Sequence, residues 1–117
     1  MVYTHSSYSI EEEISDTDTH DGRWIYIENH DYKLVRCKND ADKEVSVYIY
    51  GADRNDIEKF STDDPTGLGE QLIGSFTVSA SSNDYETITE DWQMLRAKVE
   101  YSVSPTNGED IIVGLRL

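Results

Sequence analysis

Cysteine and basic residues are scarce in this sequence of 117 residues, and their scarcity excludes several classes of protein. The single cysteine, Cys37, cannot form an intramolecular disulfide, and no second thiol exists to complete a cysteine-based zinc site. Only 10 Lys and Arg residues oppose 24 Asp and Glu residues, so nucleic-acid backbones and anionic membranes should repel the chain. No apolar run approaches the length of a membrane span, and Met1 to Ile10 lacks the features of a signal peptide. We therefore expect neither nucleic acid nor a membrane among its partners.

The excess of acidic residues is the main compositional feature. The formal net charge is −14 and the isoelectric point is near 4.3. The acids are spread along the chain rather than gathered in one tail. This composition resembles that of proteins from salt-loving archaea, in which dense carboxylates keep the surface hydrated while molar salt screens their repulsion. An acidic protein of an ordinary cell is the alternative.

Apolar and polar residues alternate with a period of two through most of the chain, which predicts β-strands. In the clearest segment, Leu95 to Val103, the odd positions should face the core and the even positions the solvent. Turn residues from Pro105 to Gly108 follow, and the alternation resumes from Ile111 to Leu117, so we expect a C-terminal β-hairpin. Two further strands, Trp24 to Glu28 and Lys33 to Lys38, should be joined by the turn Asn29 to Asp31. The remaining expected strands lie at Tyr8 to Ile14, Val45 to Tyr50, Leu72 to Ala80 and Tyr85 to Thr89.

These strands indicate a single all-β domain spanning residues 1–117, because an antiparallel sheet of this length must bury its apolar face against a second sheet. We expect an antiparallel β-sandwich or jelly roll of about 7–8 strands, with a β-barrel as the main competitor. The expected core consists of Val47, Ile49, Phe76, Val78, Leu95, Ala97, Val99, Val103, Ile111, Val113 and Leu115.

A polar stretch from Ala52 to Gly69 is the longest irregular segment, with a short helical candidate at Asn55 to Phe60. Loops of this size in compact domains are often functional. We expect this segment to contact a partner, through the residues Asp53, Asp56, Phe60, Asp63 and Leu68.

Closely spaced carboxylates precede a glycine in Asp16-Thr17-Asp18-Thr19-His20-Asp21-Gly22, as they do in calcium loops. The spacing departs from that of an EF-hand, which needs an oxygen ligand at position five, where this chain has His20, and glycine at position six. A looser calcium or sodium site formed by Asp16, Asp18 and Asp21 remains an alternative to a solvated turn. No other cofactor is expected.

No catalytic arrangement is recognisable in the sequence. The three histidines lack the spacing of zinc ligands, and no Gly-x-Ser-x-Gly motif is present to activate a serine. Cys37 lies between two cations that could activate it, but it shares a strand face with Val35 and is expected to be buried as a small hydrophobe.

Two other features keep ligand-binding and hydrolytic alternatives open. The paired acids Asp63-Asp64 and Glu90-Asp91 could perform glycosidic acid–base chemistry, although adjacent acids are common in so acidic a chain. Several aromatic residues could form a sugar-binding platform or fill strand faces and the core: Trp24, Tyr26, Tyr48, Tyr50 and Trp92.

Four segments carry a resemblance to a known class of proteins. They are Tyr48-Ile49-Tyr50-Gly51-Ala52-Asp53, Phe76-Thr77-Val78, Trp92-Gln93-Met94-Leu95-Arg96 and Ile112-Val113-Gly114-Leu115. From Val45 to Leu117 the chain resembles small β-sandwich proteins that are structural components of tailed viruses. The resemblance implies a protein that acts by assembly and catalyses no reaction.

Together with the acidic composition, this resemblance suggests a virion component of a haloarchaeal tailed virus, either a capsid decoration or a tail protein. The expected partners are further copies of the chain, as a homo-oligomer, or a larger virion protein lattice. The expected location is the virion, with the cytoplasm of a halophile as the alternative. A carbohydrate- or ligand-binding module is the alternative function, followed by a small hydrolase.

Overall fold

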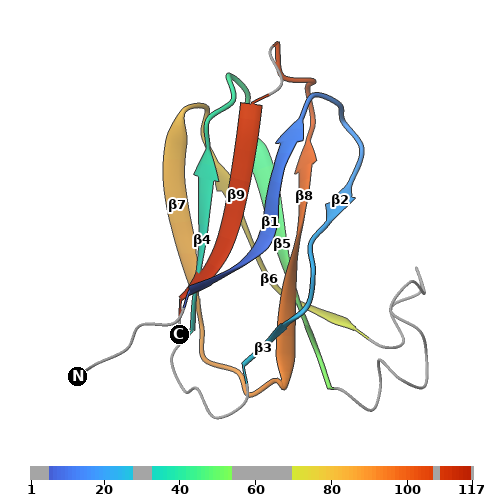
Figure 1. Ribbon diagram of the computed structural model, residues 1–117, viewed down its shortest axis with the longest axis vertical. Coiled ribbons are helices and arrows are strands. Elements are labelled where there is room, and N and C mark those ends of the chain that lie inside the picture. The colour runs from blue at the N-terminus through green and yellow to red at the C-terminus, as the bar shows by residue number, and fades with distance from the viewer. Residues whose placement is uncertain (1–5, 28–32, 54–69, 107–108, 117) are drawn as a thin grey trace.

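The computed structural model describes residues 6–27, 33–53, 70–106 and 109–116 (Figure 1). Within these ranges the chain forms nine β-strands and no helix, so none of the described segments is a helix able to cross a membrane. The strands are β1 (Ser6–Ile14), β2 (His20–Asp21), β3 (Ile25–Tyr26), β4 (Lys33–Asn39), β5 (Val45–Ala52), β6 (Gln71–Val78), β7 (Ser82–Ile88), β8 (Met94–Tyr101) and β9 (Glu109–Arg116). The helical candidate Asn55 to Phe60 lies outside the described residues.

The strands form two antiparallel sheets that pack as a sandwich. One sheet has four strands in the order β1-β9-β4-β7. The other has the order β2-β8-β5-β6, and β3 also pairs with β8. The two layers are visible in Figure 1, with β7, β4, β9 and β1 side by side. The predicted all-β sandwich is confirmed.

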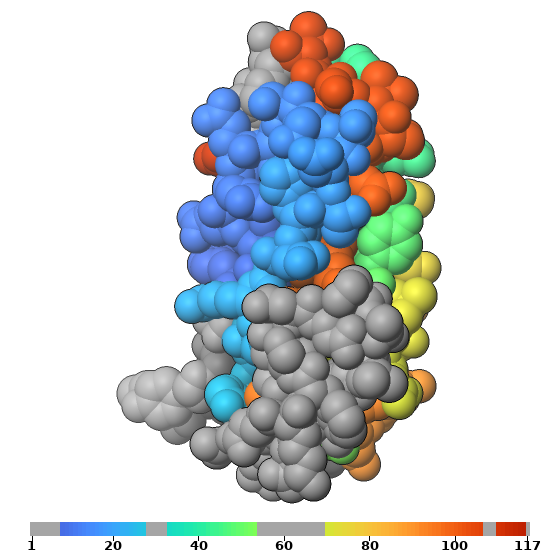
Figure 2. Space-filling view, turned by 90° about the vertical axis from the view of Figure 1, so that its right-hand side faces the viewer, coloured from blue at the N-terminus to red at the C-terminus, as the bar shows by residue number. Residues whose placement is uncertain are grey.

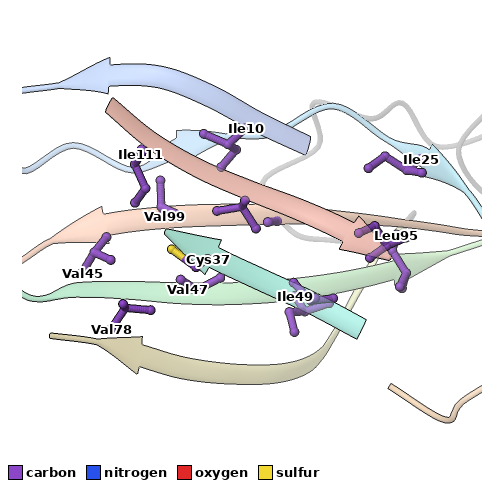
Figure 3. Close-up of a cluster of buried hydrophobic side chains, with 14 of the residues drawn as sticks. Ile10, Ile25, Cys37, Val45, Val47, Ile49, Val78, Leu95, Val99 and Ile111 are labelled. Atoms are coloured by element: carbon purple, nitrogen blue, oxygen red, sulfur yellow. The ribbon is translucent and has the colours of Figure 1, made fainter. Parts of the chain in front are cut away.

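The core lies between the sheets and follows the alternation of the sequence. On β5, Val45, Val47 and Ile49 are buried, and the neighbouring positions Ser46, Tyr48 and Tyr50 face outward and are half-buried. Figure 3 shows side chains from several strands of both sheets meeting in this layer. Burying a Val, Leu or Ile side chain contributes about 1.5–3 kcal/mol, so this layer is the main source of stability.

Most of the predicted core is confirmed, and one member is wrong. Phe76 is half-buried and packs against the core, whereas Val103 is 56% exposed. The reason is that β8 ends at Tyr101, so the inward alternation stops before residue 103. Tyr101 takes the last inward position and is fully buried, with its hydroxyl donating to Asn39 Oδ1 at 2.7 Å.

The predicted C-terminal hairpin is also wrong. Its two strands, β8 and β9, belong to different sheets, β8 pairing with β5 and β9 with β1 and β4. The segment between them crosses from one layer of the sandwich to the other. Near the crossing, Thr106 N donates to Asp42 Oδ1 at 2.9 Å and Pro105 is buried. Alternation and turn residues are local signals that do not distinguish a hairpin from such a crossing.

A similar correction applies to the strands predicted around Asn29 to Asp31. Within the described part of the first segment, residues 24–27, only Ile25–Tyr26 is a strand, and it pairs with β8, whereas β4 pairs with β7 and β9 in the opposite sheet. The two segments therefore do not form a hairpin. Residues 28–32, which include the predicted turn, lie outside the described part.

A bulge in β1 joins the two sheets along one side of the sandwich. At the register shift between Tyr8 and Ile10, Ser9 Oγ accepts from Ala97 N at 3.0 Å and donates to Arg23 O at 2.9 Å. Gly22 N donates to Ala97 O at 2.8 Å beside it. Figure 2 shows this side, where the blue side chains of the N-terminal strands lie against the orange ones of β8. Hydrogen bonds of Ser9 and Gly22 to Ala97 thus link the two sheets here, but the sheets do not close into a continuous barrel.

Candidate functional site

An ion-pair cluster lies on the outer face of the β2-β8-β5-β6 sheet. Glu70 Oε2 lies 2.6 Å from Arg96 Nη2 and accepts from Arg96 Nε at 2.9 Å. Its Oε1 accepts from Lys98 Nζ at 2.8 Å. The Glu70 and Arg96 side chains are only 7% and 8% exposed. Removing one partner of such a buried set leaves a desolvated charge at a cost of about 3–5 kcal/mol, so the cluster fixes residue 70 against β8.

Two aromatic rings stack on the cations of this cluster. The Arg96 guanidinium lies 4.7 Å from the centre of the Trp24 ring, and Lys98 Nζ lies 4.5 Å from the centre of the Tyr50 ring. The sequence places Arg96 and Lys98 at outward positions, which is correct. Their exposure is not as expected, because the carboxylate and the rings cover them.

The aromatic residues predicted as a sugar-binding platform do not form an exposed row. Trp24 and Tyr50 contact cations, and Trp92 covers Gly51 so closely that a Cβ there would lie 2.5 Å from the ring. Tyr48 is half-buried, and Tyr26 alone of the five is strongly exposed, at 57%. Most of the predicted platform therefore serves the packing of the sheet.

His20 organises the aspartate-rich segment after β1. Its Nε2 lies 2.7 Å from Asp16 Oδ1 and its Nδ1 lies 3.1 Å from Glu12 Oε1. The hydrogen bond to Asp16 and the negative charges of Asp16 and Glu12 raise the pKa of His20 above its ordinary value. In return, the hydrogen bond from His20 lowers the pKa of Asp16.

The three predicted cation ligands have different partners. Asp16 Oδ1 accepts hydrogen bonds from His20 Nε2 at 2.7 Å and from Asp18 N at 3.1 Å. Asp21 lies on β2, with Oδ1 3.8 Å from Lys98 Nζ. Among the residues that the structure describes, no group of three or more His, Cys, Asp or Glu side chains could hold a metal ion. A calcium or sodium site at Asp16, Asp18 and Asp21 stays a prediction.

The Cys37 thiol is buried on the inner face of β4, as predicted. Burial, followed by the negative charge of Asp84, raises its pKa to about 12. The thiolate is the nucleophilic form of cysteine, so this side chain is inert at neutral pH.

Of the five residues predicted to contact a partner, the described part of the chain contains only Asp53. This residue is exposed directly after β5. It lies at the end of the sheet where Ala52 pairs with Met94 and Met94 with Tyr26. Tyr26 and Leu72 are 57% and 55% exposed at this end, and we call Tyr26, Asp53 and Leu72 the sheet-end surface. The other four predicted contacts, Asp56, Phe60, Asp63 and Leu68, lie outside the described residues.

The opposite face of the sandwich carries a groove that sequence reasoning missed. It has a volume of about 390 Å³, and its lining includes Tyr8, Arg36, Lys38, Tyr85, Ile112 and Gly114. These residues come from β1, β4, β7 and β9 and are brought together by the strand order and register alone. Their alternation within each strand was visible in the sequence, but their neighbours across the sheet were not.

Comparison with known proteins identifies a fold and no family. No family model and no curated protein matches the chain significantly. Among solved structures, the chain is similar to PirA, with 11% identity, a TM-score of 0.50, and coverage of 99% of this chain and 93% of that one. It is also similar to a protein of Bacillus endospore appendages, described as disulfide-linked pili, with 14% identity, a TM-score of 0.51, and coverage of 97% and 85%. The SPBc2 prophage-derived protein YomS matches with 14% identity, a TM-score of 0.50, and coverage of 99% and 95%.

Proposed function

We propose that this protein is a structural subunit that works by assembly, with further copies of itself or with a larger protein lattice, and catalyses no reaction. The observation that carries the proposal is the similarity over 97% of the chain to a protein whose structure is described as a pilus. A sandwich whose two sheets are linked by hydrogen bonds along one side is a rigid unit suited to repeated contacts.

The finer proposal is a virion component of a haloarchaeal tailed virus, either a capsid decoration or a tail protein. The prophage origin of the similar protein YomS supports a viral source. The net charge of −14 supports a salt-rich setting, since subunits of like charge associate more readily where salt screens their repulsion. The virion is the corresponding location, with the cytoplasm of a halophile as the alternative.

We assign the assembly contact to the sheet-end surface. Tyr26 and Leu72 are both more than half exposed there, so two large apolar side chains are available to a partner at one end of the sheet. Asp53, the described part of the predicted partner loop, lies at the same end of the sheet. Tyr is also enriched in protein interfaces, because its ring packs while its hydroxyl still meets a partner.

The proposed assembly is non-covalent. The similar appendage protein belongs to disulfide-linked pili, whereas the one cysteine of this sequence is buried with a raised pKa. Reducing agent should therefore leave the assembly unchanged.

The proposal is tested by the mass of the purified protein in molar KCl, measured by light scattering over a range of concentrations. We expect oligomers for the wild type and dissociation for Leu72→Asp. The matched control is Thr77→Asp, which adds the same charge at an exposed position of the same strand and should leave the mass unchanged. A monomer at every concentration refutes assembly with further copies of the chain and leaves only docking on a different protein lattice, and equal masses for the wild type and Leu72→Asp refute the assigned surface.

A further inference from the structure

The register of the β1-β9-β4-β7 sheet aligns two exposed tyrosines with an arginine across its outer face. Tyr8 pairs with Gly114, Gly114 with Arg36, and Arg36 with Tyr85. The adjacent positions Val113, Leu115, Val35 and Cys37 point into the core, so this row faces outward. Tyr8 is 46% exposed and Tyr85 is 61% exposed.

Gly114 opens the groove between these side chains. Because Gly114 has no side chain, the backbone of β9 forms the floor of the groove between Tyr8 on β1 and Arg36 on β4. The strands β1 and β4 are separated by two strand spacings, or about 10 Å. The volume of about 390 Å³ falls within the usual range for small-ligand clefts.

Arg36 is an exposed cation without an ion pair to any residue in the described ranges. Lys38, the next outward position on β4, makes a 3.6 Å pair with Asp40, and both side chains are well exposed. The planar guanidinium of Arg36 is therefore available to bind a carboxylate through two parallel hydrogen bonds.

We propose that this groove binds a carboxylated sugar unit of a glycan. The rings of Tyr8 and Tyr85 offer flat apolar surfaces that match the C–H faces of a pyranose, and Arg36 between them matches the carboxylate. Asn83 pairs with Lys38 in the next row, and its amide can donate to and accept from sugar hydroxyls. The groove lies on the opposite face from the sheet-end surface, so the inference is independent of the proposed assembly.

The strong negative charge of the chain sets the conditions under which binding should be seen. In dilute buffer the net charge of −14 repels an anionic glycan at long range. Molar salt shortens the range of this repulsion to about 3 Å, whereas ring stacking and bidentate hydrogen bonds act at contact. We therefore expect the affinity to persist or rise in molar salt.

The test is calorimetric titration in molar KCl with three polymers: polygalacturonate, which has both sugar and carboxylate; dextran, which has sugar without carboxylate; and polyglutamate, which has carboxylate without sugar. Polygalacturonate should bind at least tenfold more tightly than either of the others. Equal binding of polyglutamate would show a docking site for acidic protein segments, equal binding of dextran would remove the role of Arg36, and no binding of any polymer would reject the site. Each of these three outcomes overturns the proposal.

Substitutions then locate the binding site. Arg36→Ala and Tyr85→Ala should each weaken polygalacturonate binding at least tenfold, and Arg36→Lys should not restore it, because ammonium lacks the planar fork. The matched control, Val103→Ala, trims an exposed apolar side chain that lies outside the groove and outside the sheet-end surface, and should bind like the wild type. Thermal melting checks that each variant folds. Binding that survives both groove substitutions would overturn the assignment, even if assembly is intact.

Discussion

Gly22 allows the two sheets to approach closely where β1 meets β8. A Cβ at this position would overlap Ser9 Oγ and lie 2.8 Å from Ala97 O, so the backbone would have to move. We predict that Gly22→Ala lowers the free energy of unfolding by about 1–3 kcal/mol, the usual cost of overpacking. Urea denaturation measures this.

Gly74→Ala is the control for that substitution. The new Cβ would lie 3.5 Å from Ile88 Cδ1, which is ordinary contact, so the change in stability should stay within about 0.5 kcal/mol. Equal losses of unfolding free energy in the two variants would show that the loss comes from replacing any strand glycine, and not from the close approach of Gly22 to Ser9.

His20 makes stability depend on pH through its carboxylate partners. Its pKa is raised in the folded protein, mainly by the hydrogen bond to Asp16, so its contribution is complete below the ordinary value of 6.5. That contribution is lost as the pH rises through the raised pKa, because the folded state then gives up a proton that it binds more tightly than the unfolded state does. Asp16, whose pKa is lowered, acts oppositely: its contribution holds above 3.8 and is lost as the pH falls.

We therefore predict that the urea midpoint of the wild type falls as the pH rises above about 6.5, and that His20→Gln flattens this fall. His5 and His30 are present in both proteins, so the difference between the two curves isolates His20. Parallel curves would contradict the assigned role.

At the level of the strand, the alternating residues of β8 are buried only as far as the strand extends. Val99 is fully buried, whereas Val103 lies beyond the end of β8 and is 56% exposed. We predict that Val99→Ala costs on the order of 1–3 kcal/mol and that Val103→Ala changes stability by less than about 0.5 kcal/mol. Denaturant titration compares the two, and equal costs would mean that the strand continues inward past Tyr101.

Strand positions and inward faces could be predicted from the sequence because they follow from local alternation. The pairing partners of the strands could not be predicted, because the inward residues of β8 and β9 recur with a period of two whether the strands form a hairpin or enter different sheets. The same limit explains the site. Tyr8, Arg36 and Tyr85 lie on three strands whose order depends on long-range pairing, so the groove was invisible. Trp24 and Tyr50, whose rings stack on Arg96 and Lys98, were expected to lie either in the core or in a sugar-binding platform. They do neither, because both cations belong to a packed ion cluster with Glu70 on that face.

Across the whole molecule, the two outer faces of the sandwich differ in chemistry. The β2-β8-β5-β6 face holds a packed ion cluster, in which Glu70 lies between Arg96 and Lys98, and ends in the sheet-end surface. The β1-β9-β4-β7 face presents exposed rings beside an unpaired arginine, as judged from the described residues. Because the faces are back to back, one can bind a partner subunit while the other stays open to a ligand.

The charge of −14 also makes a prediction for the whole chain. Exposed ion pairs such as Lys38–Asp40 are weak and few, so salt removes more repulsion than attraction. Glu13 of β1 pairs directly with Asp110 of β9, and like charges opposite each other destabilise a sheet. We predict that the melting temperature rises between about 0.1 M and 2 M KCl, as screening shortens the range of the repulsion.

Glu13→Lys should raise the melting temperature in dilute buffer and reduce the gain from salt, because the variant already replaces one repulsive pair by an attractive one. A melting temperature that is flat or falls with salt would contradict the halophilic interpretation, and an unchanged salt gain in Glu13→Lys would show that this pair is not where the repulsion acts.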